Sequence, residues 1–136
     1  MMSPRHGKQI RPITPRESRA HLAQAEEYLR AAEDALSHGH NKAATGNAVT
    51  AAVNAADAVT GAVLGNRWSG DHGGSVAHVQ TAGDAGRQIA KHLRTVLPLK
   101  SAAQYGAEPI SPARAKSCVT AARRAVEIAR RIASGR

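Results

Sequence analysis

The sequence of 136 residues predicts an all-α protein, an up-and-down bundle of four long helices with one short helix between the second and third. Three observations lead to this fold class. Apolar residues recur at intervals of three and four, which is the period of an amphipathic helix. Capping residues, Ser/Thr-Pro pairs and glycines stand where such helices would begin and end. No segment shows the strict alternation of apolar and polar residues that is typical of a strand.

Residues 1–13 come before the first helical pattern. This segment is basic, contains Pro4 and Pro12, and has no apolar period. A segment of this kind buries too little apolar surface to become ordered. We therefore expect a flexible basic tail over residues 1–13 and a single helical-bundle domain over residues 14–136, since a chain of this length is normally one domain.

The first long helix is predicted to begin at Thr14. The run Thr14-Pro15-Arg16-Glu17 is a capping box, in which the Thr14 side chain bonds the helix backbone and the Glu17 side chain returns to the cap. One apolar stripe then leads to the turn "HGHN", and its members are Leu22, Ala25, Leu29, Ala32 and Leu36.

The second long helix is predicted over Asn41–Leu64, with Gly65 as its C-terminal stop. This segment is apolar on more than one face, which is typical of a central helix that neighbours cover. Asn54 and Asp57 interrupt its apolar residues. They would line a polar pocket or make hydrogen bonds between helices, because buried polar groups need partners.

A short helix near residues 75–80 follows the loop "GNRWSGDHGG", and the third long helix is expected over residues 85–97. Asp84 is the predicted N-cap of that third helix, and Pro98 follows its end. Its core stripe consists of Ile89, Leu93, Val96 and Leu97.

A loop over residues 98–110 leads to the last long helix, which starts at Ser111 and Pro112 and reaches about Ala133. Its inward residues are expected to be Cys118, Val119, Ala122, Val126, Ala129 and Ile132.

The net charge of +9 is concentrated at the two ends of the chain. Residues 1–20 carry +4 and residues 111–136 carry +6, whereas the middle is close to neutral. Basic ends attract nucleic acid or an acidic partner, although a solvated basic face that aids solubility explains the charge equally well. The candidate nucleic-acid-binding residues are Lys116, Arg123 and Arg130, spaced by seven on one outer stripe, together with Arg11 and Arg16.

Several kinds of protein are disfavoured by composition. Cys118 is the only cysteine, so there is no disulfide framework and no thiolate metal cluster. The histidines His38, His40 and His72 have no cysteine or carboxylate at a ligand-like spacing, so we expect no metal and no cofactor. No apolar run reaches the ~20 residues that a membrane span needs. We therefore expect a cytoplasmic protein with no membrane contact.

The order of elements resembles the HEPN superfamily of small helical bundles. The resemblance is carried by "YLRAAEDALSHGHNKAATGNAVTAAVNAADAV", a histidine after a Gly-rich loop, "LPLKSAAQYG" and "SPARAKSCVTAARRAVEIA", and it covers about residues 18–133. It implies a homodimer, a nucleotidyltransferase as a partner in a toxin-antitoxin or defence system, and, in the active branches of the family, a metal-independent ribonuclease.

Active branches of this family carry an arginine, four to six residues and a histidine, commonly with Asn after the Arg and Tyr two residues after the His. Roughly two such pairs are expected by chance in a chain this rich in both residues. Three occur, and they are Arg16 with His21, Arg67 with His72, and Arg87 with His92. Arg87 and His92 are the best catalytic candidates, although Gln88 and Arg94 replace the Asn and the Tyr. Five helical positions turn two side chains roughly 140° apart, so a joint site would form across a dimer seam.

Three hypotheses about function follow from the sequence. The first is a HEPN-like binding module that contacts RNA or an acidic partner through its basic ends. The alternative is a metal-independent ribonuclease that uses Arg87 and His92. The second alternative is a structural oligomer with incidental basic ends, since a fold does not fix a function. Dimerisation is expected through the alanine-rich faces of the Asn41–Leu64 helix, whose apolar surface exceeds the need of one small bundle.

Overall fold

The computed structural model describes residues 9–134 and confirms the all-α bundle. Its helices are Pro15–Ser37 (α2), Asn41–Leu64 (α3), His72–Gln80 (α4), Gly83–Val96 (α5), Lys100–Gln104 (α6) and Pro112–Ala133 (α7). Two strands, Ile10–Pro12 (β1) and Asn66–Trp68 (β2), and a 3-10 turn, Leu97–Leu99 (η1), complete the described elements. The predicted order is confirmed, because α2, α3, α5 and α7 are the principal helices and the short α4 lies between α3 and α5.

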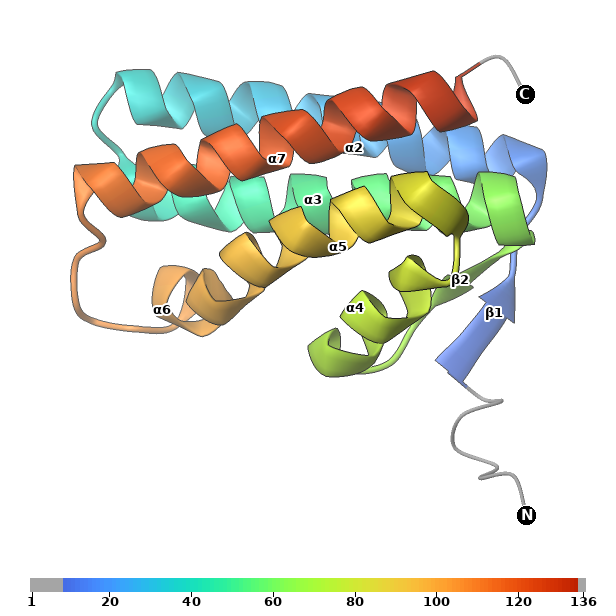
Figure 1. The fold of residues 1–136 in the computed structure, drawn as a ribbon. Helices are drawn as coiled ribbons and strands as arrows, with labels where there is room; N and C mark the ends of the chain where they lie inside the picture. The colour runs from blue at the N-terminus through green and yellow to red at the C-terminus, as the bar shows by residue number, and fades with distance from the viewer. Residues whose placement is uncertain (1–8, 135–136) are drawn as a thin grey trace.

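The principal helices form two layers (Figure 1). Helices α5 and α7 lie side by side in front of α2 and α3 and run in opposite directions. Helix α7 contacts α2, α3 and α5, so it packs against all three other principal helices. This arrangement sets the C-terminal half of α5 beside the N-terminal half of α7.

The helix ends follow the predicted capping residues. The backbone N–H of Glu17 donates to Thr14 Oγ1 at 3.1 Å, and the N–H of Thr14 donates to Glu17 Oε1 at 2.9 Å. Gly65 ends α3 with φ of 72°, a left-handed conformation that glycine adopts without steric cost. Ser111 Oγ accepts from the N–H of Arg114 at 3.2 Å and caps α7.

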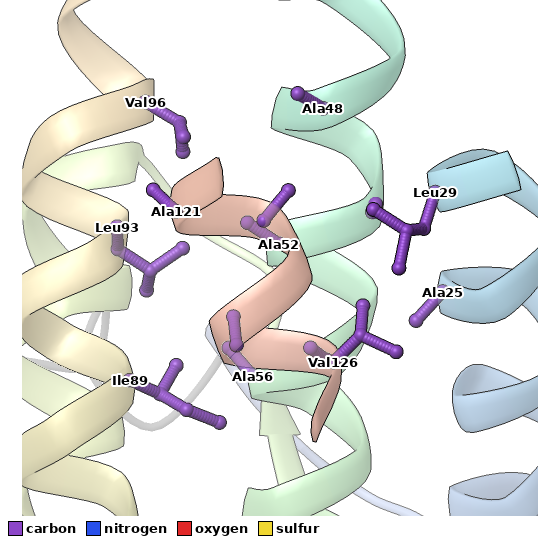
Figure 2. Packing of buried hydrophobic residues seen from close by; sticks show 14 of the residues in the cluster. Ala25, Leu29, Ala48, Ala52, Ala56, Ile89, Leu93, Val96, Ala121 and Val126 are labelled. Atoms are coloured by element: carbon purple, nitrogen blue, oxygen red, sulfur yellow. The ribbon is translucent and has the colours of Figure 1, made fainter. Parts of the chain in front are cut away.

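The core is built on small side chains of α3. Figure 2 shows Ala52 of α3 between Leu29 of α2 and Leu93 of α5, with Val126 of α7 lower in the view, at the level of Ala56. Ala52 and Leu93 are fully buried. Alanines keep neighbouring backbones close, and each helix that packs on α3 removes apolar surface from water.

The central position of α3 changes the argument for a dimer. Thirteen of its 24 residues are buried by elements of the same chain. Much of the apolar surface from which we predicted dimerisation is therefore covered by α2, α5 and α7, whereas Val63 and Leu64 at the C-terminal end of α3 are exposed.

The predicted flexible tail over residues 1–13 and the predicted lack of strands need a correction. Residues 10–12 form β1, which pairs antiparallel with β2, and Ile10 lies opposite Trp68. The N–H of Ile13 donates to the carbonyl of Gly65 at 3.0 Å, and the N–H of Ser69 donates to that of Gln9 at 2.7 Å. These backbone hydrogen bonds and the buried Trp68 hold the segment against the bundle. Residues 1–8 lie outside the described residues.

Two further local predictions differ from the structure. Asp84 was expected as the N-cap of α5, but α5 begins at Gly83 and its cap residue Ala82 makes no side-chain hydrogen bond. Asp84 instead lies in the first turn, where a carboxylate interacts favourably with the helix dipole. The expected loop over residues 98–110 contains η1 and α6.

None of the helices in residues 9–134 is both long enough and apolar enough to cross a membrane.

Candidate anion-binding groove between α5 and α7

A groove separates the exposed edges of α5 and α7. Its wider part has a volume of about 440 Å³ and is lined by His92, Thr95, Ala113, Lys116, Ser117, Thr120, Ala121 and Arg124. A second part, of about 370 Å³, adjoins it and is lined by Thr95, Pro98, Leu99, Ala113, Arg114, Ser117 and Cys118. The two parts share Thr95, Ala113 and Ser117, so they form one continuous groove.

The helical period brings the polar side chains to the groove. Lys116, Thr120 and Arg124 follow one another at intervals of four on α7, and residues four apart lie on the same face of a helix. His92 and Thr95 are three apart on α5 and lie across from them. The antiparallel contact of α5 with α7 closes the site.

The groove is cationic along its length. None of its lining residues is acidic, and within residues 9–134 neither Lys116 nor Arg124 makes an ion pair. Glu127, the one acidic residue of α7, lies outside the lining. Positive charge that no carboxylate neutralises is available to an anionic ligand.

The pKa of His92 is affected by its position in the groove. Partial burial lowers the pKa of His92, and the nearby Arg124 and Lys91 lower it further. The imidazole is therefore neutral at neutral pH and would gain a proton more readily once an anion enters the groove.

The chemistry of the lining suits a phosphate or a carboxylate. Lys116 and Arg124 supply charge-assisted donors, and the hydroxyls of Ser117 and Thr120 supply neutral ones. Such side chains are the usual partners of phosphate oxygens in nucleic-acid complexes.

Arg123 and Arg130, predicted to bind nucleic acid together with Lys116, do not line the groove and instead pair with α2. Arg123 Nε donates to Glu33 Oε2 at 2.9 Å, and Arg130 Nε donates to Glu26 Oε2 at 2.9 Å. Both glutamates belong to α2, so these two arginines join α7 to α2. Of the predicted stripe, the structure brings Lys116 alone into the groove.

Arg11 and Arg16, the other predicted nucleic-acid contacts, do not line the groove. Arg11 is exposed on β1 and lies opposite Arg67 of β2. Arg16 is exposed in the first turn of α2.

The structure does not bring Arg87 and His92 together. The Arg87 guanidinium pairs with Asp84 one turn earlier on the exposed side of α5. The charged groups that influence His92 are Arg124 and Lys91. Five residues of α5 set the two side chains on different faces, so the structure shows no contact between Arg87 and His92 within one chain.

The histidines of the two other Arg-His pairs have different surroundings. His21 Nδ1 donates to Asn54 Oδ1 at 3.0 Å and lies 4.0 Å from Asp57 Oδ2, so it joins α2 to α3. His72 lies at the start of α4, where its side chain is largely exposed. Partial desolvation of its ring and the positive charge of Lys100 lower its pKa.

Asp57 is the one strongly perturbed acid among the described residues. Burial raises the pKa of Asp57 to about 6, although the positive charges of His21 and Arg67 act against this rise. Asn54 donates its side-chain N–H to the carbonyl of Thr50 at 3.0 Å and accepts from His21. Hydrogen bonding between helices therefore accounts for Asn54, one of the two explanations that the sequence left open.

No group of three His, Cys, Asp or Glu side chains within residues 9–134 is placed to hold a metal ion. His38 and His40 stack with ring centroids 6.0 Å apart, without a third ligand.

No protein-family model matches this sequence, and no curated protein matches it. The function must therefore be argued from the groove itself.

Most of the groove was not predicted from the sequence. Thr120 and Arg124 were available as signals, because they follow Lys116 at intervals of four. Only the contact between α5 and α7 shows that this face meets His92 and Thr95.

Proposed function

We propose that this protein is a HEPN-like binding module that holds a polyanion in the groove between α5 and α7. RNA is the polyanion that we expect. The observation that carries the proposal is a continuous cationic groove whose lining contains no acidic side chain. The basic surplus over residues 111–136 is the part of the sequence that supplies most of these cations.

The groove has the length to hold more than one anionic group. Arg114 and Arg124 are ten residues apart on α7, which corresponds to about 15 Å at the rise of an α-helix. Lys116 lies between them, and His92 lies opposite. Several cations spread over the length of the groove favour a chain of phosphates over a single small anion.

Binding should have the properties of counterion release. The affinity for a polyanion would fall steeply with added salt, with a slope set by the number of phosphates that the groove neutralises. Sequence preference would be weak, because contacts to phosphates position a strand without reading its bases.

Two matched double variants test the proposal. Lys116→Gln with Arg124→Gln removes two groove cations, whereas Arg123→Gln with Arg130→Gln removes two cations on the α2 side of the same helix. Both keep good helix formers and lose the same net charge. Fluorescence anisotropy with a labelled RNA at several salt concentrations is the measurement.

The groove variant should weaken binding strongly and reduce the magnitude of the salt slope by about 2, while the α2-side variant should stay near wild type. Equal losses in both variants would show that net charge alone drives binding. No binding by the wild type at low salt would favour the structural-oligomer hypothesis.

The expected homodimer and a nucleotidyltransferase partner belong to this proposal through the resemblance to HEPN bundles. Helix α3 is largely covered within one chain, and the apolar residues that its C-terminal end exposes to a second copy are Val63 and Leu64. Sedimentation at micromolar concentration tests self-association independently of the groove.

A further inference from the structure

The two parts of the groove differ in chemistry. The part around His92, Lys116 and Arg124 is polar and cationic. The adjoining part has the apolar side chains of Pro98, Leu99, Ala113 and Cys118 around it, with Arg114 as its one charged residue.

The apolar part is an open hollow at one end of the groove. Its lining includes the fully buried Cys118, together with the exposed Pro98 and the half-buried Leu99 of η1. Burial raises the pKa of the Cys118 thiol, so this residue contributes a neutral, weakly polar group. The volume of the hollow is about 370 Å³.

A ligand that fills both parts must carry an anionic group next to a flat or apolar one. Thr95, Ala113 and Ser117 border both parts, so no barrier separates them. A nucleotide unit of a single strand has this composition, because its base has an apolar face and its phosphate is charged. A base paired inside a duplex could not enter the pocket.

We propose that the apolar end of the groove holds one unpaired base of a nucleic-acid strand whose phosphates lie along Lys116 and Arg124. This inference rests on the function proposed above and adds the class of ligand, single-stranded nucleic acid. The Arg114 guanidinium lies at the pocket and would stack on the base, as planar guanidinium groups do in single-strand complexes. Pro98 and Leu99 would contact the base from η1.

The pocket predicts a measurable contribution from bases. The lining has no aromatic side chain, so the base would contact the Arg114 guanidinium and the apolar side chains. The wild-type protein should therefore bind a single-stranded oligonucleotide about two- to fivefold more tightly than an abasic strand of equal length and charge. A duplex of the same length should also bind more weakly than the single strand.

A substitution that fills the apolar end of the groove tests whether the contribution of the base arises there. Ala113 is exposed near the start of α7, so Ala113→Leu narrows the apolar end without entering the core. Ala23→Leu, an exposed alanine on α2 outside the groove, is the matched control. Circular dichroism and thermal unfolding establish that both variants keep the fold.

Because Ala113 also borders the cationic part, the measured quantity is the ratio of the two affinities. Ala113→Leu should bring the ratio of the single-strand affinity to the abasic-strand affinity to about one, and Ala23→Leu should leave this ratio unchanged. Equal binding of the abasic and base-containing strands by the wild type would overturn the base pocket and leave the anion groove standing. Tighter binding of a duplex would also overturn it. If neither strand nor inorganic polyphosphate binds, the groove proposal fails as well.

Discussion

Arg123 of α7 donates a 2.9 Å hydrogen bond from Nε to Glu33 Oε2 of α2, and this contact separates two rows of cations on one helix. Arg124, the next residue, lies about 100° further around α7 and lines the groove with α5. Adjacent arginines thus have different surroundings. The first joins two helices, and the second faces a groove that contains no acid.

Replacement of Arg123 and Arg130 by glutamine should have a small effect on stability. Both ion pairs are partly exposed, and such pairs typically contribute below about 1 kcal/mol. Urea denaturation should show a decrease of the unfolding free energy of that size for each substitution. A loss of several kcal/mol would mean that these pairs are essential for the contact of α2 with α7.

Gly86 of α5 should not tolerate alanine, because α4 approaches it closely. A Cβ at Gly86 would lie 2.0 Å from the carbonyl oxygen of Val79, and this backbone atom cannot move aside alone. Gly86→Ala should lower the unfolding free energy by about 1–3 kcal/mol.

The matched control is Gly46→Ala on α3, where the nearest atom would be 4.0 Å away. Alanine there removes a flexible residue from a helix and should stabilise the protein by up to about 1 kcal/mol. Opposite signs for the two substitutions in thermal unfolding are the expected result. Similar values would show that α4 does not pack on α5 as described.

Asp57 should make the protein less stable as the pH rises. Its pKa is raised from 3.8 to about 6 in the folded state, so between these values the folded protein binds more protons than the unfolded one. The unfolding free energy therefore falls as the pH increases through this window, by about 3 kcal/mol, and stays low above it.

Asp57→Asn should remove this fall and be more stable than wild type at neutral pH, with little difference below about pH 4. Glu108→Gln, at an exposed loop position, is the control. Chemical denaturation across the pH range measures both. The burial of this carboxylate would be contradicted if the unfolding free energy of the wild type did not fall relative to that of Asp57→Asn between about pH 4 and 6.

RNA cleavage is not expected from the pure protein. Arg87 is paired with Asp84 and does not join His92 in one chain. Incubation of a structured RNA with EDTA should leave it intact. Cleavage that is resistant to the chelator and is lost in both Arg87→Gln and His92→Ala would support the ribonuclease alternative, with a site shared between two copies.

The helices were predictable because local signals agree with one another. Thr14 with Glu17, Gly65, and Ser111 with Pro112 each mark a helix end through hydrogen bonds or backbone angles within a few residues. The β1–β2 pair was not predictable, because three residues are too few for a strand period and its partners are over fifty residues apart. Asp84 was a plausible N-cap, but α5 begins one residue before it, at Gly83.

The candidate site was predictable only in part. Periodicity identified the exposed face of Lys116, but the sequence contains no information that Arg123 meets Glu33, ninety residues away. Spacing by seven grouped Lys116 with Arg123 and Arg130, whereas helix packing divides them between two surfaces. The groove exists because α5 lies against α7, and that contact is a property of the tertiary structure.

The most direct test of the groove is an NMR titration of the backbone amides with a short single-stranded oligonucleotide. The largest chemical-shift changes should fall on the groove residues Thr95, Ser117 and Thr120, and they should disappear in the Lys116→Gln, Arg124→Gln double variant. Shift changes centred on Glu26 and Glu33 of α2 or on the β1–β2 strands, with the groove unchanged, would contradict it.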